Sequence, residues 1–315
     1  MEKALAIAGM SKSSYYYRTR KGKPGAKPSH FTRLISGVGE TSESNEQVVE
    51  RIKDLLSGEF VDYGYHKVCG QLQLEGYVIN HKKTYRLMRE NKLLNPKNLR
   101  KGLPRNFVKY RVVKPTRPLE TLEMDIKYVY VPGLGRNAFV LTIIDTFTRM
   151  VLGWKVGFSM TCMEVKQLWE AVIEEHLQGA DLLARGLKVT VRSDNGAQFL
   201  AKIVREFLAH NHLLQENTHP YTPQENGHIE SFHAILAKAL DGYEFENLGH
   251  LEETLKDFYQ FYNEQRIHSS ICHLPPSIFW EAFENGLVQV LEGKKNMKYR
   301  LLEKRQHLLQ KLTFR

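Results

Sequence analysis

Three acidic residues lie at positions where a carboxylate suits metal-dependent chemistry: Asp125, Asp194 and Glu230. Asp125 lies inside the β-favouring segment TLEMDIKYVYVP, where a charge is costly unless it has a function. Asp194 follows the β-branched run KVTV and precedes an Asn-Gly pair, and Glu230 falls in the first turn of an expected helix. Carboxylates brought together repel one another unless a cation joins them. Mg²⁺, or Mn²⁺ in its place, binds carboxylate oxygens and substrate phosphates, and two such ions about 4 Å apart promote phosphodiester displacement.

Each of these carboxylates also has an ordinary structural interpretation. Asp194 could be a turn residue or could cap the next helix, Glu230 could complement the dipole of its own helix, and Asp125 could pair with an arginine. Taken singly, each residue favours the structural role. Their combination with basic segments on both sides favours the metal-binding interpretation.

Other side chains near the same positions are weaker candidates. Asp145, in the strand-like segment NAFVLTIIDTFTR, is interpreted as structural, with direct metal contact as the alternative. Glu225 precedes the expected helix in a Pro-rich loop and ranks behind Glu230. His233 lies one helical turn after Glu230 and could face the same site.

The cysteines indicate a reducing compartment. Cys69, Cys162 and Cys272 are far apart and odd in number, which argues against a disulfide framework. Cys272 with His268 and His273 gives only three zinc ligands and no paired CxxC, so the zinc signal is weak. No apolar run is long enough to span a bilayer, and the start of the chain has too short an apolar piece and too many tyrosines to be a convincing signal peptide. We therefore expect a cytoplasmic protein without membrane contact.

Positive charge is concentrated in three segments. The chain carries a net charge of +10, and residues 91–119 contain no acidic residue. The N-terminal RTRKGKPGAK and residues 294–315 are basic as well. Each segment could be a solvated linker or tail, but together they favour nucleic acid as the partner.

The elements that position these residues divide into five expected parts. Residues 46–95 read as three short helices, the last starting after the N-cap Asn80, in the manner of a helix-turn-helix unit. Three successive antiparallel strands and then alternating helices and strands predict an α/β core with a mixed sheet. An N-terminal basic helix with a flexible linker (1–45) precedes the small all-α helix-turn-helix-like domain (46–95). A basic Pro-containing linker (96–117), the α/β core (118–285) and a basic tail (286–315) follow.

The expected DNA contacts are basic residues from three of these parts. The last helix of the 46–95 domain is basic, as a groove-reading helix would be, although its face could also be merely solvated. The tail is an arm for DNA or a partner. The residues expected to touch DNA are Lys82, Lys83, Arg86, Arg89, Arg100, Lys101, Arg105 and Lys238.

The sequence segments around the three carboxylates are distinctive. The segments MDIKYVYV, TIIDTFTRMVLGW, RSDNGAQF, TPQENGHIESFHAIL and YNEQRIHSS resemble successive blocks of bacterial transposases of the insertion-sequence-three family. MSKSSYYYR resembles the start of that family's second-frame product (OrfB), and YGYHKVCGQLQLEGYVINHKKTYRLMRENKLL resembles its helix-turn-helix block. The 35 residues between Asp194 and Glu230 are similar to the DDE signature of retroviral-integrase-type cores.

The resemblance implies a fold and a set of site residues. The core would be a ribonuclease-H-like mixed five-stranded sheet flanked by helices, with Asp125, Asp194 and Glu230 as ligands of two Mg²⁺ ions. Asn195 and Gly196 would shape the turn beside Asp194. The helix that presents Glu230 would start at Asn226 and Gly227, and His233 would support the site. Where the family usually has a basic residue, this chain has Ala237, with Lys238 one position later.

The resemblance also implies an activity and its partners. The expected reaction is cleavage at the ends of an insertion element, followed by attack of the freed 3′-OH on another DNA phosphodiester. Double-stranded DNA, a homo-oligomer holding two DNA ends, and an upstream-frame helix-turn-helix and leucine-zipper product would be the partners, in the cytoplasm on the nucleoid. Two alternatives stay open: a DNA-binding regulator that does not cut, and a nuclease of the same fold that only hydrolyses.

Overall fold

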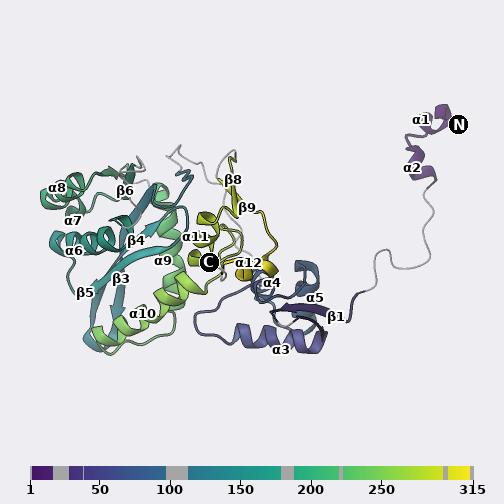
Figure 1. Ribbon diagram of the computed structural model, residues 1–315, viewed down its shortest axis with the longest axis horizontal. Coiled ribbons are helices and arrows are strands. Elements are labelled where there is room, and N and C mark those ends of the chain that lie inside the picture. Colours follow the sequence, from purple (N-terminus) through teal and green to yellow (C-terminus); the bar gives the residue numbers. More distant parts are fainter. Residues whose placement is uncertain are drawn as a thin grey trace.

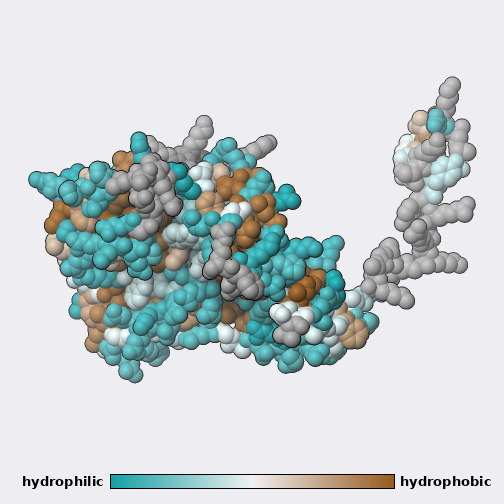
Figure 2. Space-filling view, viewed as in Figure 1, coloured by the Kyte–Doolittle hydropathy of each residue, from teal (hydrophilic) through white to brown (hydrophobic). Residues whose placement is uncertain are grey.

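The structure is a computed structural model that describes residues 2–16, 28–37, 39–96, 113–178, 188–219, 223–293 and 297–312. Its body combines a sheet covered by helices with a smaller helical unit, and the helices α1 (Glu2–Ile7) and α2 (Lys12–Tyr15) lie away from that body (Figure 1). The face seen in Figure 2 is mostly hydrophilic, with separate hydrophobic patches. No helix among the described residues is long and apolar enough to cross a membrane.

A five-stranded mixed sheet forms the larger part. The strands are β3 (Thr121–Val131), β4 (Arg136–Asp145), β5 (Val151–Gly157), β6 (Val189–Ser193) and β7 (Leu213–Asn217). They lie in the order β5-β4-β3-β6-β7, with β3, β4 and β5 antiparallel and β6 and β7 parallel to β3. Three antiparallel strands followed by parallel ones is the expected ribonuclease-H-like arrangement, so this prediction is confirmed.

Helical crossovers supply the parallel strands, because parallel neighbours cannot be joined by a tight turn. Helix α6 (Cys162–Val172) and the π-helical η2 (Ile173–Gln178) follow β5, and α7 (Ala197–Leu200) and α8 (Lys202–His210) lead from β6 to β7. Helix α6 begins with a capping box at Thr161. The short η3 (Pro223–Asn226) then leads into α9 (Gly227–Ala239), and α10 (Leu248–Glu264) follows.

The two faces of the sheet have different covers. Met124 of β3 and Ile143 of β4 pack with α6 and α8 on one face. Val140 and Ile144 of β4 pack with α9 and α10 on the other. Side chains alternate along a strand, so the odd-numbered acids of β3 point to the face that α9 covers.

The helical unit contains the three expected helices: α3 (Asn45–Leu56), α4 (Tyr65–Leu74) and α5 (His81–Glu90). The Asn80 side chain accepts from the Lys83 N–H and caps α5, as expected. Ser44 caps α3 in a capping box with Gln47.

The prediction of a flexible linker is wrong for residues 31–44. Residues 31–44 form a hairpin of β1 (Phe31–Ser36) and β2 (Gly39–Ser44) in front of α3, so the unit is not all-α. Leu34 pairs with Tyr77 and joins the apolar cluster of the helices, which gives the hairpin a buried side. The strand β2, with sequence GETSES, is polar along its whole length and gives no hydrophobic signal of a strand.

The expected tail is also folded where it is described. After α11 (Pro276–Glu284), the strands β8 (Val288–Leu291) and β9 (Lys298–Leu301) pair and lead into α12 (Arg305–Leu312). Leu308 and Leu312 are buried among the side chains of α3 to α5. The Arg305 guanidinium donates to the Cys272 carbonyl and to Gln73 Oε1 at 2.8 and 2.7 Å. The last segment thus completes the apolar core of the helical unit.

The helical unit and the sheet are joined. Phe147 and Phe279 belong to the same apolar cluster as the side chains of α3 to α5. Asp62, before α4, forms ion pairs with Arg266 at 2.7 Å and with Lys238 of α9 at 2.9 Å. Apolar and ionic contacts thus fix one unit on the other.

Candidate active site

Asp125 lies on β3, on the face covered by α9. Its side chain is 25% exposed, and its Oδ1 accepts a hydrogen bond from the Ile126 N–H at 2.8 Å. Burial and then the charges of Asp194, Glu230 and Glu123 raise the pKa of Asp125 to about 6, against the lowering by the Ile126 N–H. The charges of the other two candidate carboxylates therefore reach Asp125.

Asp194 is exposed at the turn after β6. Its Oδ1 accepts from the Gly196 N–H at 2.8 Å, so the same carboxylate also organises the turn. The Asn195 amide donates to the Thr218 carbonyl at 3.0 Å and ties this turn to the end of β7. A Cβ at Gly196 would lie 2.6 Å from Gln198 Nε2, so the turn leaves no room for a side chain there.

Glu230 lies in the first turn of α9, with its side chain toward solvent. The apolar stripe of this helix, Ile229, Phe232 and Leu236, is buried against the sheet as expected. Burial and the charge of Glu123 raise the pKa of Glu230. The Ile229 N–H, one residue before Glu230, donates to Glu123, so this part of α9 lies next to the start of β3.

Helix α9 begins without a capping hydrogen bond from its own N-cap residue. Asn226 occupies the N-cap position and Gly227 is the first helical residue. The Asn226 side chain makes no capping hydrogen bond, and its buried Oδ1 has no partner among the described residues. Another group must therefore satisfy the first N–H groups of the helix.

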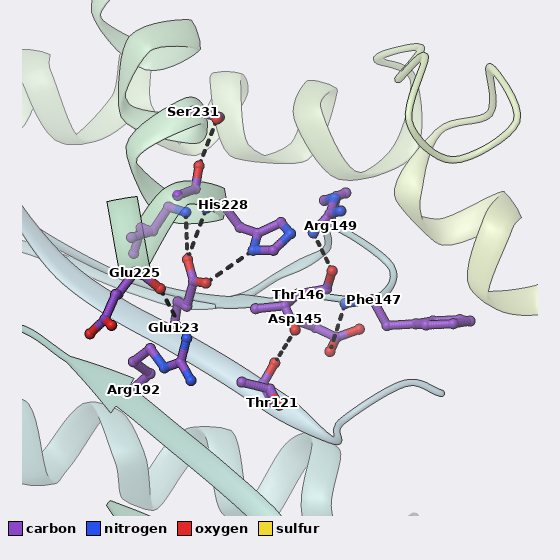
Figure 3. Close-up of polar contacts among 12 residues, drawn as sticks. Thr121, Glu123, Asp145, Thr146, Phe147, Arg149, Arg192, Glu225, His228 and Ser231 are labelled. Carbon is purple, nitrogen blue, oxygen red and sulfur yellow. Dashed lines mark hydrogen bonds and ion pairs between the residues drawn. The ribbon is translucent and has the colours of Figure 1, made fainter. Parts of the chain in front are cut away.

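That group is Glu123, which the sequence did not single out. Its side chain is completely buried in β3 and accepts from the His228 N–H at 3.1 Å and the Ile229 N–H at 2.8 Å (Figure 3). His228 Nδ1 lies 3.0 Å from the other carboxylate oxygen. The only signal in the sequence was its place two residues before Asp125, which puts both side chains on one face of the strand.

His233 lies beside Asp125. Its Nδ1 is 3.5 Å from Asp125 Oδ2, and its Nε2 is buried without a partner in the described part of the chain. Burial and the charge of Lys127 lower the pKa of His233 to about 4. The ring is thus neutral at physiological pH and lies against the Asp125 carboxylate.

Two alternative carboxylates have structural partners. Asp145 is fully buried and accepts from the Leu119 N–H and from the N–H and hydroxyl of Thr148. The Glu225 carboxylate is buried and lies 3.0 Å from Nδ1 of His219, whose N–H also donates to it. Both carboxylates hold turns together, which agrees with the structural interpretation of Asp145 and the lower rank of Glu225.

The donor set suits a hard divalent cation, because all three candidate ligands are carboxylates. Within the described ranges, however, no group of three or more His, Cys, Asp or Glu side chains is already close enough to hold a metal ion. The three carboxylates would have to move together when an ion binds. The same finding leaves the zinc interpretation of His268, Cys272 and His273 without support.

The expected DNA-binding residues of α5 divide into two pairs. Lys83 Nζ donates to the Phe31 carbonyl at 2.7 Å, and Arg86 donates to the Ser29 carbonyl at 3.0 Å. These two side chains hold the backbone at the start of β1, and their assignment as DNA-contacting residues stays a prediction. Lys82 and Arg89 are exposed.

The remaining expected contacts lie elsewhere. Lys238, the residue after Ala237, forms an ion pair with Asp62 and so joins the two units. Arg100, Lys101 and Arg105 lie outside the described residues.

Comparison with known proteins agrees with this arrangement. Two family models described as integrase core domains match residues 115–223 and 212–276, and one described as an HTH-like domain matches residues 43–101. An uncharacterized 31.7 kDa protein of insertion element IS407 from Burkholderia multivorans is 26% identical, over 88% of this chain and 89% of its own. The transposase InsD of an Escherichia coli IS2 element is 26% identical, over 77% of this chain and 81% of its own.

Among solved structures, the catalytic core of BIV integrase is 18% identical with a TM-score of 0.39, over 53% of this chain and 97% of that one. The two integrase matches together run from residue 115 to 276, the part of the chain that contains the sheet, α9 and all three candidate carboxylates. The sequence resemblance to insertion-sequence transposases is therefore confirmed, and the chain belongs to the proteins with an integrase core domain, preceded by an HTH-like domain.

Proposed function

We propose that this protein is the catalytic subunit of a DNA transposase, which cleaves DNA at the ends of an insertion element and joins the freed 3′-OH to new DNA. The observation that supports the proposal is the hydrogen bond from the Ile229 N–H to Glu123, which brings the first turn of α9, with Glu230, next to the part of β3 that carries Asp125, while Asp194 follows the neighbouring strand β6. The integrase core match and the insertion-element relatives support it.

The three carboxylates are the proposed ligands of two Mg²⁺ ions, with Mn²⁺ as a substitute. When bound, such ions activate the attacking oxygen and neutralise charge at the phosphodiester. Asp125 supplies the most buried carboxylate, and neutral His233 beside it limits the positions that Oδ2 can take. The turn at Asn195 and Gly196 keeps Asp194 at the strand end, and Glu230 comes from the first turn of α9.

Double-stranded DNA is the proposed substrate, and two basic surfaces are its proposed contacts. The first is α5, where Lys82 and Arg89 are exposed. The second is an open groove of about 730 Å³ next to β9, where Lys298, Arg300 and Lys304 are exposed and where the exposed Ser269 and Ser270 also line the wall. Cations and hydroxyls at such a surface fit the phosphate backbone.

The proposed working form is an assembly, in the cytoplasm on the nucleoid. Joining two DNA ends requires at least two copies of the site to be held together. A product of an upstream reading frame, with a helix-turn-helix and a leucine zipper, would supply further end recognition.

The decisive experiment incubates the purified protein with labelled element-end DNA and Mg²⁺ or Mn²⁺. We expect nicking of the blunt end and strand transfer from a pre-nicked end. Asp194→Asn should lower both by about 10³-fold, the equivalent of several kcal/mol of lost charge stabilisation, with unchanged DNA binding. Binding without either product would favour the regulator alternative, and hydrolysis without strand transfer would favour the nuclease alternative.

A further inference from the structure

Glu123 is an acid buried in a strand with no exposed surface. A carboxylate in that position is costly unless hydrogen bonds compensate for lost water. Here they do, because the carboxylate receives two backbone N–H groups and lies against the His228 imidazole. The group is therefore built into the fold as an acceptor.

The two N–H donors belong to the first turn of the helix that carries Glu230. Helix α9 has no capping hydrogen bond from its own N-cap residue, Asn226. Glu123 takes over that function from the neighbouring strand, where a negative charge also suits the helix dipole. Figure 3 shows its side chain reaching from β3 toward the start of α9.

A second contact holds the turn immediately before α9. Arg192 of β6 lies opposite Glu123 in the strand register. Its guanidinium donates to the Glu225 carbonyl at 3.1 Å and to Glu216 Oε2 at 3.0 Å. The entry to α9 is thus fixed to β6, and its first turn is fixed to β3.

The Glu123 carboxylate lies close in the chain or by contact to two candidate ligands. Glu123 is two residues from Asp125 on the same face of β3, and Ile229, which donates to it, is the residue before Glu230. The position of Glu230 relative to Asp125 therefore depends on this carboxylate.

We propose that Glu123 is a positioning residue of the active site, whose carboxylate fixes the first turn of α9 and thereby holds Glu230 at the correct place relative to Asp125. The proposal rests on the proposed function, in which these two residues share the reacting centre. The proposal depends on the length of the Glu123 side chain, which lets its carboxylate extend from β3 to the N–H groups of α9.

Two substitutions separate reach from charge. Glu123→Asp keeps the charge but shortens the side chain by one methylene, so its oxygens withdraw from the two N–H groups. Glu123→Gln keeps the length and one acceptor oxygen but removes the charge. Glu164→Gln is the matched control, because Glu164 receives the Thr161 N–H at the start of α6, a helix without a candidate ligand.

The readouts are turnover in strand transfer, DNA affinity, amide hydrogen exchange at residues 228–229, and Mn²⁺ affinity of the DNA-free protein. We expect Glu123→Asp to lower turnover by about 10- to 100-fold with unchanged DNA affinity, as for other residues that orient a metal ligand. Exchange at the two amides should accelerate and Mn²⁺ binding weaken. Glu123→Gln should stay within a few-fold of the wild type, and Glu164→Gln should equal it.

The opposite order, with Gln inactive and Asp active, would overturn the proposal in favour of charge alone. Faster exchange in Glu123→Asp with unchanged turnover would also overturn it, because the contact would then be merely structural. If Glu123→Asp does not fold, His228→Gln replaces it, with a two- to five-fold loss of turnover expected and no change contradicting the proposal. If the wild type does not act on DNA, the proposed function fails by itself, and the order of Mn²⁺ affinities decides the role of Glu123.

Discussion

At the scale of single residues, the negative charge of Asp125 does not stabilise the folded protein. The raised pKa of Asp125 means that its ionised form is less favourable in the folded state than in the unfolded state. A group of this kind destabilises the fold above its folded pKa, and the cost disappears as the pH falls toward the ordinary value of 3.8. Such a cost is typical of a functional carboxylate.

Asp125→Asn should therefore stabilise the protein while abolishing its activity. In EDTA at pH 8, we expect the free energy of unfolding to rise by about 1–3 kcal/mol, since one unit of pKa shift corresponds to about 1.4 kcal/mol. The gain should shrink as the pH falls from above 6 to below 4, where wild-type Asp125 is protonated in both states. Urea titrations at pH 8 and pH 4 measure it, and an equal effect at both would contradict the electrostatic cause.

The three candidate ligands could be proposed from the sequence because each has a local signal. Asp125 interrupts an apolar strand, Asp194 ends one, and Glu230 starts a helix. Glu123 stands in the same strand, two residues before Asp125, but its role depends on N–H groups of His228 and Ile229, more than 100 residues later in the chain. Similarly, the partners of Lys83 and Arg86 come from a segment whose hairpin could not be foreseen.

At the scale of elements, the sequence did not predict the hairpins β1-β2 and β8-β9, and both pack on segments that are distant in the chain. The strand β1 docks on the turn after α4: the Ile35 N–H donates to the Gly76 carbonyl, and the Val78 N–H donates to the Arg33 carbonyl. No alternation of apolar and polar residues within 31–44 could indicate that contact. The helices of the unit were predictable, because their caps and apolar faces are local.

Gly76 is the position where this docking is most sensitive. It has a φ of +100°, and a Cβ there would lie 2.1 Å from the Ile35 carbonyl oxygen. We expect Gly76→Ala to destabilise the protein by about 3 kcal/mol, from backbone strain together with displacement of β1.

Gly242→Ala is its matched control. Gly242 also has a positive φ, +88°, but no atom lies within 4 Å of its added Cβ, so about 1 kcal/mol is expected. Thermal unfolding of both variants measures the difference. Equal losses would show that the close approach of β1 contributes nothing.

At the scale of the whole molecule, one acid joins the helical unit to the core. Asp62 contacts Lys67, Lys238 and the buried Arg266. Burial raises the pKa of Asp62, but the charge of Arg266 and the hydrogen bond from Lys238 outweigh this effect and hold it at about 2. The folded pKa lies below the unfolded one, so the stabilisation is complete above pH 4 and is lost as the pH falls from about 4 to about 2.

Asp62→Asn should weaken this junction. It leaves Arg266 buried without its anionic partner, for which we expect a loss of about 3 kcal/mol at pH 7. The loss should diminish toward pH 2, and the exposed Asp54→Asn should cause little change. Unfolding measured between pH 7 and pH 2 tests this, and a loss that does not depend on pH would contradict the ion-pair explanation.

The groove beside β9 makes the folded C-terminal segment part of the proposed DNA path. Replacing Lys298, Arg300 and Lys304 together by Gln removes three cations from its wall without touching the buried side of the hairpin. If each contacts one phosphate, the slope of log affinity against log salt concentration should become less steep by about 3. Fluorescence anisotropy with element-end DNA at several salt concentrations measures this slope. The triple variant of Lys53, Lys166 and Lys202, cations on α3, α6 and α8, is the control, and an equal effect of both sets would mean that only net charge attracts DNA.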